Sequence, residues 1–381
     1  MRVTTEPELD SVLTLGWGTV VEIAVPVLKV DARVAVPAGA TIRGYRKLID
    51  NGPEVHTCDT VKEGPLFLVE MDSVRITGLR LRGPMDDPRC PSGTLPEDAS
   101  AIEINSKNGE RVLIDHVESS HWTGHSVKVG RENRIAWGDL GQCDLYSPRE
   151  PLPRRTPVRA IGNFLHHNYG YGVVARYGAS VVMQGNTTAY RHAHSFASDA
   201  AADTSYQAFD NFVLRKTISE HVVHDFDVHG GLHEGGHSYS GGAAGDSYDI
   251  GFNTILATDK LNLLHRGTPC REMRFHDNVL LRSQSESVET RTKFPNCSSD
   301  FPRHCDYSNH YSSPDPTNDL AVGDFDGDSL DDIFVGTGVA WYFSSGGRAE
   351  WRFLNRMPEH ASELLFGDFD GDGRTDIMAL S

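Results

Sequence analysis

The feature that most constrains the fold is an asparagine that recurs along the middle of the chain. Five short phrases, IGNF, QGNT, FDNF, FNTI and HDNV, hold Asn163, Asn186, Asn211, Asn253 and Asn278, at intervals of 23, 25, 42 and 25 residues. A period of 20 to 25 residues, with strands rich in β-branched residues and no helical pattern, predicts a β-solenoid. One asparagine per turn predicts a stacked ladder in which each side-chain amide bonds to the next. The interval of 42 is interpreted as two turns.

The rest of the N-terminal part agrees with an all-β fold. Residues 74–83, 101–104 and 112–119 have the strand pattern of earlier turns without the asparagine. The chain holds 37 Gly and 19 Pro, and only 38% of its residues are hydrophobic. This composition favours many short strands joined by turns.

Three phrases carry a family resemblance. VPAGATIRGYRKL at 36–48 resembles the opening turn of pectate-lyase-like right-handed parallel β-helix proteins, and VLIDH at 112–116 is similar to a motif of pectate lyases. RGTPCR at 266–271, followed by FHDN at 275–278, is loosely similar to their Arg-Pro-Arg region, but the proline spacing differs and the catalytic arginine is not carried over. The resemblance spans roughly residues 10 to 295 and implies a right-handed parallel β-helix with an N-terminal element over its open end.

The C-terminal region has a different pattern. GDFDGDSLDDIFV at 323–335 and GDFDGDGRTDIMA at 367–379 repeat at an interval of 44 residues, and each resembles an FG-GAP or VCBS repeat. Alternating acidic oxygens around a glycine turn can wrap Ca²⁺. The expected ligands are Asp324, Asp326, Asp328, the Leu330 carbonyl and Asp332, and then Asp368, Asp370, Asp372, the Arg374 carbonyl and Asp376. We therefore expect a β-helix domain with its cap at 1–310 and a small β region of calcium-binding repeats at 311–381.

Charge and cysteine content narrow the setting. The net charge of −17 argues against a nucleic-acid partner. The chain contains no run of 18 apolar residues, so we expect no membrane span. Six Cys without a CxxC pair indicate disulfides, with Cys297 and Cys305 near enough in sequence to pair. We expect a secreted, extracellular protein whose leader is absent from this sequence, because MRVTTEPELD is not a signal peptide.

The stretch HVVHDFDVHGG at 221–231 is the predicted catalytic segment. Strand alternation places Val222, Phe226 and Val228 toward the solenoid interior, so that Asp225, Asp227 and His229 point outward together. The following His- and Gly-rich loop at 232–245 is expected to fold over them and to supply His233 or His237.

Counting 13 residues from each ladder asparagine predicts a polar column on the outer face. The column contains Lys128, Arg176, Asp199, His224 (Asp225 if the turn shifts by one), Arg266 and Arg291. Acids in the middle with cations on both sides suit a groove for a chain-like anionic substrate, with Arg266 beside the catalytic acids.

Several chemistries fit this pattern. Paired aspartates can divide into acid and base for glycoside hydrolysis. A cation that neutralises a uronate carboxylate, with or without Ca²⁺ at the acids, and a histidine base suit β-elimination or epimerisation. His229, His233 and His237 are spaced by four residues, but the paired glycines between them disfavour a helical transition-metal site. A polysaccharide-degrading or polysaccharide-modifying enzyme is the prediction, and a non-catalytic carbohydrate-binding or adhesin protein is the alternative.

Overall fold

The computed structural model describes most of the chain. The described residues are 1–45, 52–58, 64–90, 98–105, 111–130, 157–176, 178–190, 194–198, 204–214, 224–228, 245–256, 262–265, 269, 272–280, 288–290, 304–307, 309 and 318–379.

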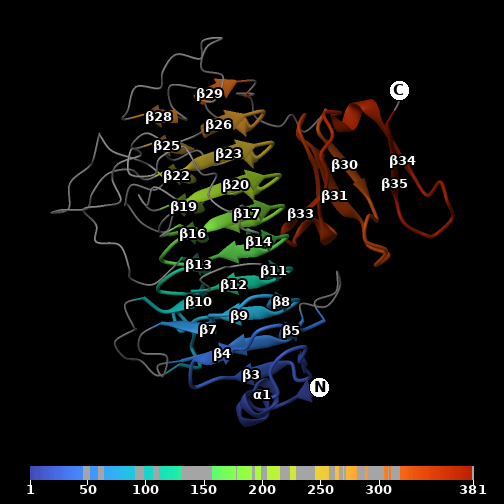
Figure 1. The fold of residues 1–381 in the computed structure, drawn as a ribbon. Coiled ribbons are helices and arrows are strands. Elements are labelled where there is room, and N and C mark those ends of the chain that lie inside the picture. The colour runs from blue at the N-terminus through green and yellow to red at the C-terminus, as the bar shows by residue number, and fades with distance from the viewer. Residues whose placement is uncertain are drawn as a thin grey trace.

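Three long parallel sheets wind around one interior and form a parallel β-helix (Figure 1). Sheet A consists of β1 (Arg2–Val3), β2 (Val20–Ile23), β5 (Thr41–Arg43), β8 (Arg75–Thr77), β11 (Leu113–Asp115), β14 (Val158–Ile161), β17 (Ser180–Gln184), β20 (Ser205–Phe209), β23 (Ser247–Gly251), β26 (Glu272–His276) and β29 (His304–Tyr307). Sheet B consists of β3 (Val27–Lys29), β6 (Glu54–His56), β9 (Arg80–Arg82), β12 (Glu118–Ser120), β15 (Phe164–His166), β18 (Thr187–Ala189), β21 (Phe212–Val213), β24 (Thr254–Ile255) and β27 (Val279–Leu280). Sheet C consists of β4 (Val34–Val36), β7 (Pro65–Val69), β10 (Ser100–Ile104), β13 (Val127–Val129), β16 (Val173–Ala175), β19 (Phe196–Ser198), β22 (Phe226–Val228), β25 (Leu263–His265) and β28 (Val288–Thr290). The predicted all-β, right-handed parallel β-helix is confirmed.

The interior is apolar because each strand turns alternate side chains inward. Phe196 and Phe226 stack in successive turns with ring centroids 5.2 Å apart, and neither is exposed. Val228 lies in the same buried cluster, as the alternation of residues 226–228 predicts. Each fully buried side chain of this size contributes about 1.5–3 kcal/mol. The outward residues between them are therefore free to vary, and they are the ones that can carry function.

The predicted asparagine ladder is confirmed. The Nδ2 group of Asn163 donates to Oδ1 of Asn186 at 2.9 Å, and the same bond repeats at each step through Asn211, Asn253 and Asn278 to Asn309. Asn211 bonds directly to Asn253, and β20 pairs directly with β23. The prediction that the interval of 42 residues holds two turns is therefore wrong: it is one turn with a long insertion.

A short helix lies at the N-terminal end of the solenoid (Figure 1). Helix α1 (Glu6–Leu13) begins after Thr5, whose hydroxyl accepts the Glu8 amide, as an N-cap residue should. Leu9 and Leu13 are buried in the solenoid core. The helix thus covers apolar surface at the end where the first strands would otherwise be open.

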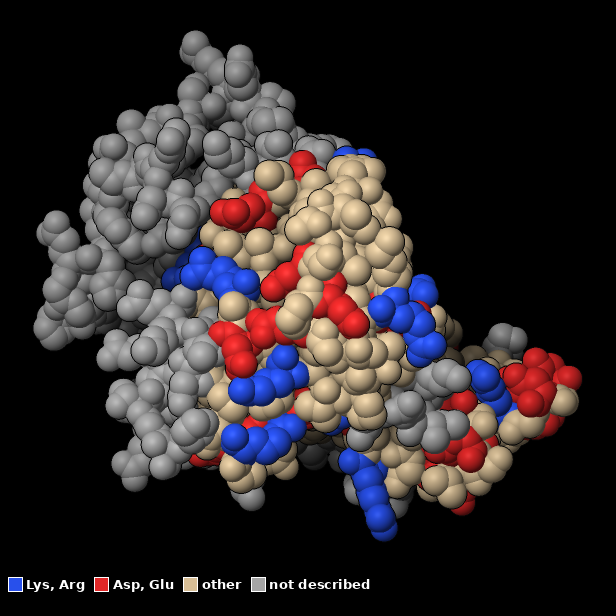
Figure 2. Space-filling model, turned by 90° about the horizontal axis from the view of Figure 1, so that it is seen from below, with Lys and Arg blue, Asp and Glu red and all other residues tan. Residues whose placement is uncertain are grey.

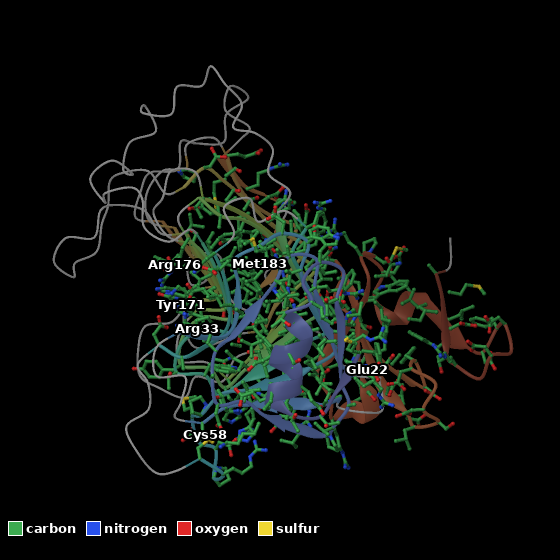
Figure 3. All side chains as sticks on the ribbon, turned by 60° about the horizontal axis from the view of Figure 1, so that its bottom comes forward. Glu22, Arg33, Cys58, Tyr171, Arg176 and Met183 are labelled. Carbon is green, nitrogen blue, oxygen red and sulfur yellow. A yellow bond between two sulfur atoms is a disulfide. The ribbon has the colours of Figure 1, made fainter. Side chains whose placement is uncertain are left out.

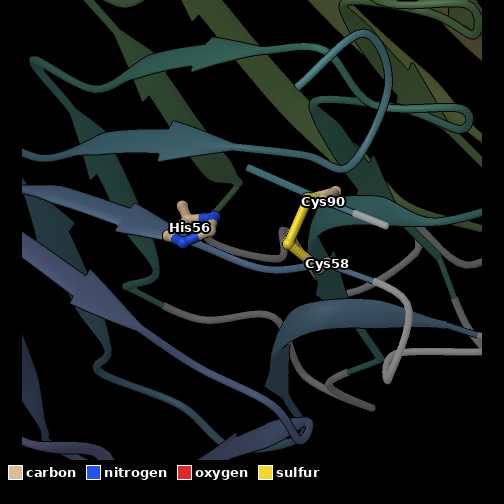
Figure 4. A group of neighbouring side chains, drawn as sticks. All are labelled: His56, Cys58 and Cys90. Carbon is tan, nitrogen blue, oxygen red and sulfur yellow. A yellow bond between two sulfur atoms is a disulfide. The ribbon is translucent and has the colours of Figure 1, made fainter. Parts of the chain in front are cut away.

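A disulfide links two turns near this end. Cys58 and Cys90 are bonded at a sequence separation of 32, and His56 lies beside them (Figure 4). The sequence spacing did not single out this pair. Cys297 lies outside the described residues, and its pairing with Cys305 stays a prediction.

The C-terminal region forms antiparallel sheets that pack against the solenoid. One sheet contains β30 (Leu320–Gly323), β31 (Asp332–Gly336), β32 (Trp341–Ser344) and β33 (Trp351–Asn355), and the other contains β34 (Leu364–Gly367) and β35 (Asp376–Ala379). Two 3₁₀ turns, η2 (Ser345–Gly347) and η3 (Ala361–Glu363), connect the strands.

The contact between the two regions is built on sheet B. The outward positions of four successive turns carry no charge there: Thr187, Phe212, Thr254 and Val279. Tyr342 packs against Phe212 at 4.8 Å between ring centroids. Arg356 pairs with the buried Asp210 at 2.8 Å, so the docked arrangement is held by apolar contacts and by an ion pair.

Candidate functional site

The outer face of sheet C carries a column of charged and apolar residues, and both its composition and its register differ from those predicted. Lys128 aligns with Val174, which aligns with Ala197, which aligns with Asp227. Val174 and Ala197 lie 11 residues after their ladder asparagines, not 13, and Asp227 lies 16 after Asn211. The predicted alignment of Lys128 with Arg176 and with Asp225 is therefore wrong, because the distance from the ladder to this column is two residues shorter than assumed in two turns and three residues longer in the turn of Asp227.

Asp225 does not share the outer face with Asp227. Asp225 occupies the position that Ser195 has in the preceding turn. The Ser195 hydroxyl lies 3.1 Å from the hydroxyl of the buried Thr188. The Asp225 carboxylate is fully buried and accepts a hydrogen bond from the Asn262 amide at 2.9 Å. Strict alternation fails here because residue 225 precedes the strand and belongs to the turn, where polar side chains bond within the wall.

A ladder of aromatic rings borders the outer column. His125, Tyr171, His194 and His224 occupy equivalent places in four successive turns, with centroids 4.8, 5.1 and 5.3 Å apart. Tyr171 and Arg176 lie together on the side of the solenoid away from the C-terminal region (Figure 3). The ladder holds these rings rigidly, which is the requirement for groups that transfer protons or position a substrate.

His194 and Asp227 form a buried pair on this face. Nε2 of His194 lies 3.2 Å from Oδ2 of Asp227, and both residues are buried. Nδ1 of His194 is 3.0 Å from both the backbone nitrogen and the carbonyl oxygen of His224. An ionised Asp227 can only accept, so Nε2 carries the hydrogen directed at it. The predicted outward placement of Asp227 agrees with this contact.

The neighbouring turns add cations and two further acids. Nζ of Lys128 lies 3.3 Å from Glu103 and 3.9 Å from Asp98. Desolvation raises the pKa of Asp98, while Lys128 and Arg176 oppose the rise. The pKa of His125 is held well below its usual value by burial and then by Arg176 and Lys128, so this imidazole is neutral. Arg176 thus lies close enough to act electrostatically on both His125 and Asp98.

Other predicted residues cannot be placed. Asp199, His229, His233, His237, Arg266 and Arg291 lie outside the described residues, as does the loop at 232–244. The predicted contact between Arg266 and the acids therefore stays a prediction.

Sequence reasoning missed Tyr171, His194, His125, Asp98 and Glu103. A signal for the rings existed: HSVKVG, YGVVAR, HSFASD and HDFDVH begin at 125, 171, 194 and 224 and align position by position. Reading these phrases against one another would have given both the aromatic ladder and the correct register. Asp98 and Glu103 have no comparable repeat.

The two predicted calcium loops share one hydrogen-bond pattern. Asp324 accepts the amides of Gly327 and Ser329, and Asp368 accepts those of Gly371 and Gly373. In each loop, three aspartates place carboxylate oxygens within 4.8 Å of one another. They are Asp324, Asp326 and Asp332 in the first loop, and Asp368, Asp370 and Asp376 in the second. Acidic side chains gather visibly on the C-terminal region (Figure 2).

Asp328 and Asp372, two further members of the predicted ligand sets, also bond within their own loops. Asp328 and Asp372 accept the backbone amides of Leu330 and Arg374, respectively. Asp326 is buried, and its Oδ2 accepts no hydrogen bond from any described residue. A buried carboxylate oxygen without a donor is costly, and a bound cation removes that cost.

Comparisons with known proteins give only distant similarity. No protein-family model matches the chain, and no curated protein matches it in sequence. The A-module of the mannuronan C-5 epimerase AlgE4 from Azotobacter vinelandii is 12% identical, with a TM-score of 0.38, over 81% of this chain and 91% of that one. The tailspike protein gp49 of the Acinetobacter baumannii bacteriophage Fri1, a capsular polysaccharide depolymerase, is 8% identical, with a TM-score of 0.28, over 100% of this chain and 80% of that one.

Similarity at this level assigns the chain to neither family. In the described part of the chain, no helix is long and apolar enough to cross a membrane.

Proposed function

We propose that the protein is an extracellular enzyme that acts on a uronate-containing polysaccharide, with its active site on the outer face of sheet C. The observation that carries this proposal is the connected set Tyr171, His194 and Asp227 beside the cations Lys128 and Arg176. Parallel strands about 4.8 Å apart place these groups along a line, as a chain-like substrate requires.

The reaction that this set supports best is β-elimination. A cation neutralises the uronate carboxylate, which acidifies the neighbouring C5 proton. Tyr171, as the phenolate, removes that proton, the C4–O bond breaks and a C4–C5 double bond forms. The Tyr171 hydroxyl then gives the proton to the leaving oxygen, which restores the phenolate. His194, whose two ring nitrogens are bonded to Asp227 and to the backbone of His224, orients the Tyr171 ring by stacking on it. Asp227 fixes the tautomer of His194 and balances its charge. Return of the proton to the opposite face of C5 would instead give epimerisation.

Hydrolysis is a second candidate because two carboxylates flank Lys128. Asp98 and Glu103 contact the same ammonium group, and desolvation raises the pKa of Asp98. A carboxyl with a raised pKa beside an ionised one is the division of roles that glycosidases use.

The test is turnover on a panel of acidic and neutral polysaccharides with a Tyr171→Phe variant. This change removes the phenol oxygen and keeps the ring stack, so we expect a loss of about 10²- to 10⁴-fold in kcat with an unchanged Tm. Tyr190→Phe is the matched control, since Tyr190 also stacks on a histidine, at 4.7 Å from His167, but lies outside the set.

The products separate the candidate reactions. New absorbance near 235 nm shows the unsaturated uronate that elimination forms. New reducing ends without this absorbance show hydrolysis. An altered C5 configuration, with neither new absorbance nor new reducing ends, shows epimerisation. Binding of a polysaccharide without any of these changes would refute the enzymatic proposal and favour the adhesin alternative.

We further propose that each C-terminal aspartate loop binds one Ca²⁺. The support is the shared loop geometry together with the buried, donor-free Oδ2 of Asp326. Hard carboxylate oxygens at this spacing suit Ca²⁺, and backbone carbonyls of Leu330 and Arg374 would complete the sets. Metal analysis after dialysis against calcium buffer should give two Ca²⁺ per chain, and a value near zero would refute the assignment.

A further inference from the structure

A cavity of about 570 Å³ opens between the solenoid and the C-terminal sheet. The solenoid wall consists of Gln184 at the end of β17 and of the turns that join sheets A and B, including Gly162 and Gly185. The opposite wall is β33, which is the edge strand of its sheet. The volume lies within the range of small-molecule binding sites.

The C-terminal wall supplies flat apolar faces. Trp351 and Phe353 are two residues apart on β33, so their side chains share a face. Trp351 stacks on Phe212 at 5.3 Å, Phe353 meets Tyr342 edge-on at 5.9 Å, and the Thr187 hydroxyl donates to the Trp351 carbonyl. The rings are therefore held in place before any ligand arrives.

Gly185 has no side chain, so the solenoid backbone can lie close to β33 at this position. Gly185 has φ of +62°, and a Cβ there would lie 3.3 Å from Cβ of Phe353. A side chain at this position would be strained by the backbone and would press on the aromatic wall. The close approach of the solenoid to β33 at this edge of the cavity depends on this residue.

The polar groups of the cavity are fixed and almost neutral as a set. Arg352 and Glu350 pair at 3.3 Å. His116 contacts Asp115 at 2.9 Å, and Asp115 in turn pairs with Arg75 at 2.7 Å. Paired charges leave donors and acceptors for hydroxyl groups but no net charge to select an ion.

We propose that this cavity is a second carbohydrate-binding site, which takes uncharged sugar units of the polysaccharide. Arg352 and Glu350 alternate with Trp351 and Phe353 along the chain and therefore lie on the other face of β33, so the cavity reaches both faces round the edge of this strand. The aromatic side chains suit the apolar face of a sugar ring, and Arg352, Glu350, Gln184 and His116 suit its hydroxyl groups. The cavity lies where the C-terminal sheet meets the solenoid, and that sheet is on the side of the solenoid away from Tyr171 and Arg176 (Figure 3). The claim that this site anchors the enzyme's substrate rests on the proposed function. The claim that it binds sugars does not.

Isothermal titration of the full chain with cellohexaose, maltohexaose, mannohexaose and xylohexaose tests the site directly. At least one should bind with little dependence on salt, because no net charge is involved. Arg352→Ala should weaken that binding tenfold or more. Arg274→Ala is the matched control, since Arg274 also pairs with a glutamate two residues away, Glu272, at 2.9 Å, outside the cavity. His116→Asn is the second variant, because asparagine tolerates the positive φ of 54° there.

The outcomes are distinct from those of the turnover test. Binding of none of the four sugars, or equal weakening by Arg352→Ala and Arg274→Ala, overturns the second site even if the enzyme is active. Sugar binding that requires Arg352 and His116 supports it even if no polysaccharide is turned over. With an active enzyme, Arg352→Ala should raise KM for long substrates and leave kcat unchanged, whereas Tyr171→Phe should lower kcat.

Discussion

Replacing Asn211 by alanine should cost the solenoid about 4 kcal/mol. The amide donates to Oδ1 of Asn253 at 2.9 Å and to the Met183 carbonyl at 3.0 Å. Its oxygen accepts the backbone and side-chain nitrogens of Asn186 at 2.9 and 3.0 Å. Asn211 is fully buried, so water cannot replace these bonds. Four bonds at about 1 kcal/mol each give the total, and partners left unsatisfied in the wall push it higher.

Urea unfolding followed by circular dichroism measures this loss. The midpoint should fall at an unchanged m-value, because the surface exposed on unfolding is the same. Asn355→Ala is the matched control, since Asn355 is exposed and accepts only the Arg356 amide among the described residues, and it should cost less than about 0.5 kcal/mol. A loss below about 1 kcal/mol for Asn211→Ala would show that the ladder is not a main source of stability.

Three further predictions concern the site and its surroundings. Asp227→Asn should lower kcat by roughly 10²-fold or more while preserving the β-sheet circular dichroism spectrum, because the amide cannot balance a charge on His194; full activity would remove Asp227 from the site. His121 directly follows β12 and stacks on His167 at 5.2 Å between ring centroids. Burial lowers the pKa of His121 to about 4, so the stability it contributes is complete above its ordinary pKa of 6.5 and is lost as the pH falls from 6.5 toward 4. His121→Asn should flatten the dependence of Tm on pH in that window, and an unchanged slope would contradict this. Calcium chelation should make the C-terminal region sensitive to protease and leave the solenoid resistant, whereas cleavage unchanged by chelation would argue against structural Ca²⁺.

The repeat was readable from the sequence because it is local and periodic. An asparagine that needs its copy one turn away must recur at the length of a turn, so the spacing of Asn163 to Asn278 is enough to indicate the solenoid. The interval from Asn211 to Asn253 shows where this reasoning ends. An insertion and an extra turn add the same number of residues, and only the direct bond between the two amides tells them apart.

The outward place of Asp227 also followed from alternation, since Phe226 and Val228 flank it within one strand. Asp225 did not follow, because it lies in the turn before the strand, where alternation no longer holds. Its fully buried carboxylate bonds to Asn262, which is 37 residues further along the chain.

The sequence alone determined a parallel solenoid with an asparagine ladder and two aspartate loops, because these are set by spacing within the chain. Tertiary structure decided the strand register on sheet C, which brings His194 to Asp227 and Lys128 to Glu103. It also decided the docking of β33 against sheet B, which forms the cavity beside Trp351. These contacts depend on turn lengths and on surfaces far apart in sequence, and a shift of one or two residues in a turn exchanges the side chains that meet.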